Sequence, residues 1–224
     1  MGGRCNFDAG GTAVSIIPKL CCTAVILCTF ILCVTGCAGT EKSRFYTLDY
    51  LAMAPPGSPA AGSSGVSVGI GPVHLPEYLN RPQIVTRTGK YKLDIADFDR
   101  WAAPLDAAFS RVLAENLSIL LSTDRVFIHP WTPSRRLDYQ VPIEIIQLDG
   151  SIPGDANLMV RWSLLKDGRE TRIILKKFRN GKPIAGQGYP GLVTAMSLCI
   201  ADLSREIAEA VLAAGGLGTN TAEE

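Results

Sequence analysis

The sequence predicts an α+β domain in which a mostly antiparallel sheet carries two amphipathic helices packed on one face. Several segments alternate apolar and polar residues as strands do, and two longer stretches carry apolar residues at three- and four-residue spacing. Neighbouring strand segments are often joined by short turn sequences, which favours hairpins over parallel crossovers. If the second face of this sheet is moderately apolar, it is a candidate docking surface for another subunit.

Strand periodicity begins at Arg44–Tyr50, where Tyr46, Leu48 and Tyr50 share one side. Two segments around Gly89-Lys90 form a predicted hairpin, and the last two strands meet at Asp167-Gly168, a strong two-residue turn signal. The predicted strands after the first are 66–70, 83–88, 91–96, 126–129, 139–148, 158–165 and 171–178.

Two segments have the periodicity of helices with one buried face. The first begins at Pro104, where a missing N–H costs nothing, and the second spans 192–212. The apolar face of the first holds Leu105, Phe109, Val112, Leu113, Leu117 and Leu120. The stripe of the second holds Val193, Met196, Ile200, Leu203, Ile207 and Val211. Cys199 lies beside this stripe, which favours packing in the core over a role as a nucleophile.

The N-terminal segment has the layout of an export signal. An apolar run from Leu20 to Val34 follows Lys19, and as a helix it would span about 22 Å, short of the roughly 30 Å hydrocarbon core. The run ends in Val-Thr-Gly-Cys37, which resembles a bacterial lipobox: cleavage before Cys37 and acylation of its thiol with chains such as palmitate. An uncleaved anchor and a buried helix are the alternatives. Ala38, in place of aspartate, favours the periplasmic face of the outer membrane.

Processing at this cysteine defines the expected domain organisation. Residues 1–36 are the lipoprotein signal peptide, 37–43 the lipid anchor and a short tether, and 44–214 a single domain. Within it, 52–65 is a Pro-, Gly-, Ala- and Ser-rich mobile loop, and 215–224 is a disordered tail. The mature chain has equal numbers of basic and acidic residues, which argues against nucleic acid as a partner. Only Cys199 remains as a free thiol, so no intramolecular disulfide is expected.

No catalytic, metal-binding or cofactor-binding pattern emerges from the chain. His74 and His129 stand alone without zinc-site spacing, and Ser67, in a G-x-S-x-G match, reads as an outward-facing strand serine. Four carboxylates lack the glycine and glutamate of an EF-hand and read as capping or helix-dipole partners. They are Asp94, Asp97, Asp99 and Asp106. We therefore expect a protein that is not an enzyme and has no cofactor or metal.

The segment 71–87 is a candidate contact surface. Three prolines fix its backbone and would display an aromatic residue and an arginine in defined places, a composition typical of protein-contact hot spots. The alternative is a shaped connector whose leucines cap the core. The candidate contact residues for a partner or a second subunit are Leu75, Pro76, Tyr78, Leu79, Arg81 and Pro82.

Four stretches together resemble the ABC-type transport auxiliary lipoproteins of the PqiC/YmbA family. They are Phe-Tyr-Thr-Leu at 45–48, the segment 71–87, Arg-Trp-Ala-Ala-Pro-Leu at 100–105, and Asp-Tyr at 138–139. The resemblance implies a non-catalytic outer-membrane lipoprotein that works with an MCE-domain protein in phospholipid transport between membranes and supports membrane integrity. It also implies ring-like self-association. The alternative function is a periplasmic lipid carrier that holds an acyl chain in an apolar groove between helices and sheet.

Overall fold

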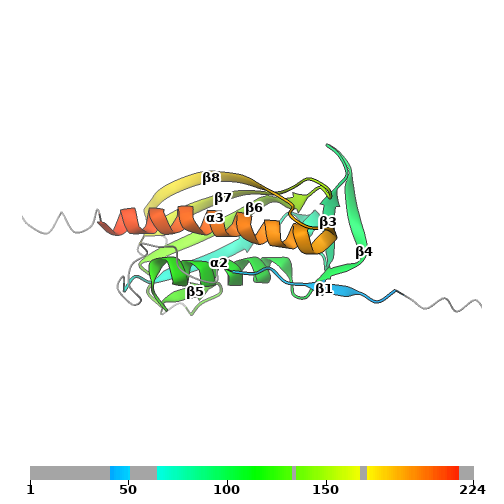
Figure 1. Cartoon of the computed structure of the whole chain (residues 1–224). Coiled ribbons are helices and arrows are strands. Elements are labelled where there is room, and N and C mark those ends of the chain that lie inside the picture. Colours follow the sequence, from blue (N-terminus) through cyan, green and yellow to red (C-terminus); the bar gives the residue numbers. More distant parts are fainter. Residues whose placement is uncertain (1–40, 51–64, 133–134, 167–170, 217–224) are drawn as a thin grey trace, which may run out of the picture. The chain divides into compact units, whose positions relative to one another are not determined.

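The described residues form a three-stranded sheet, a five-stranded sheet and two long helices (Figure 1). The small sheet has the strand order β1 (Arg44–Tyr46), β4 (Leu93–Trp101), β3 (Gln83–Arg87). The large sheet has the order β5 (Val126–Ile128), β2 (Val68–His74), β6 (Tyr139–Gly150), β7 (Asp155–Lys166), β8 (Thr171–Pro183). The helices are α2 (Leu105–Leu121), α3 (Gly188–Gly216) and a short 3-10 turn, η1 (Glu77–Leu79).

This computed structural model describes residues 41–50, 65–132, 135–166 and 171–216. The expected signal peptide, Cys37, the Asp167-Gly168 turn and all of the loop 52–65 except its last residue lie outside these ranges. Of the expected tail 215–224, the first two residues belong to α3 and the others also lie outside. The described residues from Ser43 onward belong to one compact unit.

The α+β class and the two helices are confirmed, but the prediction of a mostly antiparallel sheet was wrong. The antiparallel pairs are β3–β4, β6–β7 and β7–β8, whereas β1–β4, β2–β5 and β2–β6 are parallel. After β2 the chain first builds η1, β3, β4 and α2, and only then returns to place β5 and β6 on either side of β2. This long excursion acts as the crossover that makes the five-stranded sheet mixed. The small sheet is mixed because the chain passes through β2, η1 and β3 between the parallel strands β1 and β4.

Both helices pack on one face of the five-stranded sheet (Figure 1). α2 contacts β2 and β5, α3 contacts β6, β7 and β8, and the two helices contact each other. Between them the buried Asn116 side chain donates to the Ser204 hydroxyl at 3.0 Å. The six predicted residues of the α2 face and the six of the α3 stripe are all buried. The helical periodicity therefore identified the correct core faces.

Alternate residues of β7 supply the sheet side of this core. Leu158, Val160, Trp162 and Leu164 are at most 1% exposed, and burying side chains of this size contributes about 1.5–3 kcal/mol each.

Cys199 of α3 is fully buried, as predicted, and burial raises the pKa of its thiol to about 11. A thiol with a raised pKa is the opposite of an activated nucleophile.

Element boundaries differ from the prediction at two informative places. Pro104 caps α2 instead of occupying its first turn, and the helix begins at Leu105. β2 continues through Gly71 to His74, so the first part of the predicted connector is strand. Gly71 has a φ of 107°, and a Cβ there would lie 2.9 Å from the Cβ of His129. Only glycine fits this position in the strand.

The face of the five-stranded sheet away from the helices is covered at its two ends. At one end, a Cβ on Gly69 would lie 2.4 Å from Leu137 and 2.9 Å from Trp131, so the segment after β5 packs directly on the backbone of β2. At the other end, Tyr78 of η1 reaches Asp149 of β6. The middle of this face lies between Trp131 and Leu137 at one end and Tyr78 at the other.

Candidate functional site

The six candidate contact residues of the 71–87 segment fall into three environments. Leu79 is 3% exposed and belongs to the core, and Leu75 is half-buried against the core. The carbonyl of Pro76 accepts the N–H of Leu79 at 3.0 Å, which closes the η1 turn. Leu79 therefore holds the segment to the core, in line with the connector alternative.

Tyr78, the second environment, donates its hydroxyl to a fully buried carboxylate. Asp149 accepts from Tyr78 at 3.1 Å, from Arg87 Nη2 at 2.7 Å and from Gln147 Nε2 at 2.7 Å. Burial, reinforced by the charge of Asp149, raises the pKa of Tyr78 to about 12. The hydrogen bond to Asp149 raises the pKa of Arg87. This cluster fixes η1 and β3 against β6.

Arg81 and Pro82, the third environment, line a cavity of about 350 Å³. Asn80 from the same segment and residues 101–105, which run from the last residue of β4 to the first of α2, complete its lining. The N–H of Trp101 donates to the carbonyl of Pro82 at 2.7 Å and so holds the two stretches together. Two of the motif stretches singled out in the sequence, far apart along the chain, therefore form one site, which we call the Arg81 cavity.

The Arg81 cavity offers positive charge without a protein acceptor. The Arg81 Nε is buried and has no hydrogen-bond partner in the part of the chain that the structure describes. A buried donor left without a partner costs about 1–3 kcal/mol. Pro104, which caps α2 at the cavity, supplies no side-chain acceptor for the first-turn amides. The site can therefore accept an external hydrogen-bond acceptor or negative charge, but its lining holds no nucleophile or general base.

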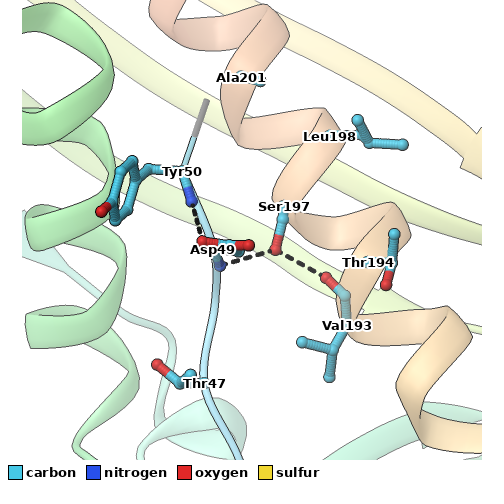
Figure 2. A pocket seen from close by; sticks show the side chains of 8 residues that line it. All are labelled: Thr47, Asp49, Tyr50, Val193, Thr194, Ser197, Leu198 and Ala201. Atoms are coloured by element: carbon cyan, nitrogen blue, oxygen red, sulfur yellow. Dashed lines mark hydrogen bonds between the residues drawn. The ribbon is translucent and has the colours of Figure 1, made fainter. Parts of the chain in front are cut away.

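A second cavity, of about 330 Å³, lies between the segment after β1 and α3 (Figure 2). Figure 2 shows Ser197 accepting from the N–H of Asp49 at 3.1 Å and donating to the carbonyl of Val193 at 2.8 Å. The carboxylate of Asp49 in turn accepts the N–H of Tyr50 at 2.9 Å. The Ser197 hydroxyl therefore both accepts and donates a hydrogen bond within the protein, and it holds the segment after β1 on α3.

Asp99, one of the four carboxylates considered for a calcium site, is instead a buried acid paired with the half-exposed Arg44. Arg44 donates Nε and Nη2 to its two oxygens at 2.7 and 2.8 Å, and the Tyr46 hydroxyl donates at 2.7 Å. The Arg44 guanidinium holds the pKa of Asp99 below its usual range. Asp106 lies in the first turn of α2, as the helix-dipole interpretation predicted. Within the described ranges, no three metal-ligating side chains come together.

The serine of the G-x-S-x-G match is not outward-facing, which corrects the prediction. Ser67 is 1% exposed, and both its N–H and its hydroxyl donate to Asp138 Oδ2 at 2.7 Å. In addition, the N–H of Asp138 donates back to the Ser67 hydroxyl at 3.0 Å. This reciprocal pair joins the start of β2 to the start of β6. The serine therefore has a structural partner that its sequence context did not indicate.

Sequence reasoning missed the second half of the Arg81 cavity and the acid of the buried cluster. Residues 101–103 enter the sequence analysis only through the family resemblance, and Pro104 and Leu105 otherwise only as the start and buried face of a helix. The resemblance was the signal that could have placed them at a site. For Asp149 the signal was weaker: a carboxylate at the end of an apolar strand, with no indication that Arg87 would reach it.

The fold and the Arg81 cavity define a small α+β domain with an open cavity at the junction of β4 and α2. The sequence profile of the ABC-type transport auxiliary lipoprotein component family matches residues 46–208. The chain belongs to this family. No curated protein matches the chain in a sequence comparison.

Two solved structures share the fold. One is the Xanthomonas campestris protein XCC0632, 13% identical, with a TM-score of 0.64 over 80% of this chain and 100% of that one. The other is a crystal structure of an uncharacterised protein, 21% identical, with a TM-score of 0.62 over 76% of this chain and 99% of that one. In the described ranges no helix has the length and hydropathy needed to span a membrane.

Proposed function

We propose that this chain is a non-catalytic docking subunit of an MCE-type system that moves phospholipids between membranes and supports membrane integrity. Acylated Cys37, after removal of residues 1–36, anchors it to the periplasmic face of the outer membrane. Family membership supports an auxiliary role in transport. The observation that best supports docking is the Arg81 cavity, where the stretches 71–87 and 100–105 meet. The Nε of Arg81 has no described hydrogen-bond acceptor there.

The physical basis of docking is the unsatisfied Arg81 side chain. A partner carboxylate or carbonyl that enters the cavity would supply the acceptor that Arg81 lacks, and charge-assisted hydrogen bonds of this kind are among the stronger polar contacts. The exposed Ala102, Ala103 and Pro104 add apolar contact area around it. Trp101 and Leu105 are buried beneath them and belong to the core.

Arg81→Glu tests the docking proposal. We expect the variant to lose co-purification with the MCE-domain partner, because the reversed charge would repel the acceptor. The matched control is Lys90→Glu, which reverses an exposed cation on the β3–β4 turn and should leave recovery unchanged. Recovery of the partner by Arg81→Glu at the level of the unmodified chain would refute the Arg81 cavity as its binding site.

Cys37→Ala tests the anchor separately. Three acyl chains hold a protein stably on a membrane, whereas none leaves it in the periplasm. We expect the variant to leave the outer-membrane fraction and to fail to restore membrane integrity in a strain that lacks the protein. Outer-membrane fractionation of the variant would show that the anchor lies elsewhere.

Self-association is a further part of the proposal. A docking subunit at the end of a transport conduit would be expected to surround the exit with several copies. Native mass spectrometry of the full chain in mild detergent gives the number of copies. A strictly monomeric mass at micromolar concentration would argue against a ring.

The lipid-carrier alternative has less support among the described residues. It requires an apolar groove between the helices and the sheet, where Phe109, Leu117 and Trp162 are at most 1% exposed and pack together. Co-purified phospholipid in the same mass spectra would revive it.

A further inference from the structure

Strand β8 forms a long free edge of the five-stranded sheet. Its 13 residues pair with β7 on one side, and no described strand lies on the other (Figure 1). β5 at the opposite edge has only 3 residues. A free edge presents unpaired backbone N–H and C=O groups, which an added strand can satisfy. β8 is the longest edge strand that the structure describes.

The charge of β8 is entirely of one sign. Its sequence, TRIILKKFRNGKP, holds five cations and no carboxylate. Lys182 pairs with Asp202 of α3 at 2.6 Å, and Lys176 lies 3.9 Å from a carboxylate of the same helix. Lys177 and Arg179 are exposed and have no acidic partner among the described residues; Arg179 reaches only the sulfur of a methionine, at 3.7 Å. Two cations of this edge are therefore left for a ligand.

Apolar side chains accompany these cations. Ile173 is 40% exposed and Leu175 is 56% exposed. Leu175 borders a hollow of about 290 Å³ on the middle of the sheet face away from the helices, with Pro72 and Pro142 among its walls. Charged edge residues often serve only to prevent strand pairing. That role gives no reason to expose two large aliphatic side chains on the same edge.

A row of paired residues across the sheet indicates which charge an added strand would carry. His74 lies opposite Glu144, Glu144 opposite Arg161, and Arg161 opposite Lys177. Glu144 and Arg161 form an ion pair, whereas Lys177 ends the row at the free edge. The next position of the row lies on the added strand, and a carboxylate there would complete a favourable cross-strand pair.

We propose that β8 binds an extended acidic segment of a partner polypeptide, which adds to the sheet as a further strand. Carboxylates of this segment lie opposite Lys177 and Arg179, and apolar side chains lie beside Leu175. A second copy of β8 is the poorer occupant, because it brings five further cations and no carboxylate to this edge. An anionic membrane surface supplies charge but no row of N–H and C=O groups for the edge.

The test uses the full chain in mild detergent and a short fluorescent peptide in which Glu alternates with Val and Thr. We expect binding, measured by fluorescence anisotropy, and a loss of affinity of roughly tenfold or more for Lys177→Glu with Arg179→Glu. Two further probes carry Lys in place of Glu, or N-methyl groups on alternate amides along either edge. The Lys peptide should fail to bind because it lacks the negative charge. At least one N-methylated peptide should also fail, because it lacks the backbone N–H groups that would donate to β8.

The matched control is Lys90→Glu with Lys92→Glu, which reverses two exposed cations away from β8 and should leave peptide affinity unchanged. Equal binding of the Glu and Lys peptides, or of all N-methylated peptides, would overturn the proposal. So would absence of peptide binding combined with binding to phosphatidylglycerol vesicles that the β8 variant loses, because the surface would then face lipid. The assay needs no transport partner, so its result is independent of the docking function.

Discussion

Arg81 and Arg87 lie six positions apart on the same connection, yet they belong to opposite kinds of environment. Arg87 donates to the fully buried Asp149 and is surrounded by polar partners. Arg81 lines a cavity and leaves its buried Nε without a described acceptor. The segment therefore combines an end held by Asp149 with an end that, in our proposal, binds a partner. Side-chain chemistry alone does not distinguish the two arginines.

The largest expected effect comes from removing the acid that holds the fixed end. Asp149→Ala would remove the fully buried carboxylate and its hydrogen bonds to Tyr78, Arg87 and Gln147, while the side chain of Arg87 remains 29% exposed to water. We expect a loss of about 2–3 kcal/mol of unfolding free energy, below the cost of leaving a fully buried charge unpaired. Urea unfolding of the full chain in mild detergent, followed by tryptophan fluorescence, measures this loss. Asp155→Ala, an exposed acid on β7, is the control and should change stability little. A loss below about 1 kcal/mol for Asp149→Ala would mean that the cluster is not structural.

A smaller effect is expected for the hydroxyl that completes the same cluster. Tyr78→Phe removes one hydrogen bond to a carboxylate that keeps Arg87 and Gln147 as donors, so we expect a loss of about 1.5 kcal/mol. The same urea titration applies, with the 88% exposed Tyr91, changed to Phe, as the unaffected comparison. Because Tyr78 is structural, its replacement by alanine would not be a clean test of partner contact.

The pH dependence of stability tests whether the Tyr78 phenol stabilises the folded chain through Asp149. The pKa of Tyr78 is about 12 in the folded chain and near 10 when unfolded, so the phenol is favoured by folding. Its contribution is complete below pH 10 and is lost as the pH rises from 10 to 12. The stability difference between the parent chain and Tyr78→Phe should therefore shrink across this window. A constant difference across it would contradict the raised pKa.

The smallest change in stability is expected at the available end. Arg81→Ala removes a buried donor with no described partner and, with it, the packing of the arginine stem. These two effects have opposite signs, so the unfolding free energy should stay within about 0.5 kcal/mol of the parent value. A loss comparable with that of Asp149→Ala would mean that Arg81 is a structural residue and would erase the contrast between the two arginines.

Local periodicity predicted the elements well and their partners poorly. The helical stripes and the buried side of β7 followed directly from spacing, because helix and strand periods determine which residues share a face. Spacing contains no information on which strands pair after a long excursion. β6 itself gave little sign of its parallel neighbour, because in its middle the buried Ile143 and Ile145 flank the exposed Glu144, as in a strand with one buried face. Short turn sequences between neighbouring strands therefore favoured hairpins.

The candidate site was half predictable for the same reason. Prolines and an arginine between two strands indicated a displayed segment, and Arg81 and Pro82 do line a cavity. Tyr78 and Asp149 are 71 residues apart in sequence, so their contact depends on how η1 packs on β6 and not on any local pattern. Ser67 and Asp138 are separated by the same distance. Polar pairs that join distant segments were the feature that sequence reasoning could not supply.

The short strand β1 has a mechanical consequence. Tension applied to the chain at its N-terminal end reaches Arg44 first, where a bidentate ion pair with Asp99 and parallel pairing to β4 resist it together. Further along, the N–H of Asp49 is tied to Ser197 of α3. If the chain is anchored at Cys37 as we propose, a pull on this end would load the contacts with β4 and then the contact with α3 before the buried layer between helices and sheet.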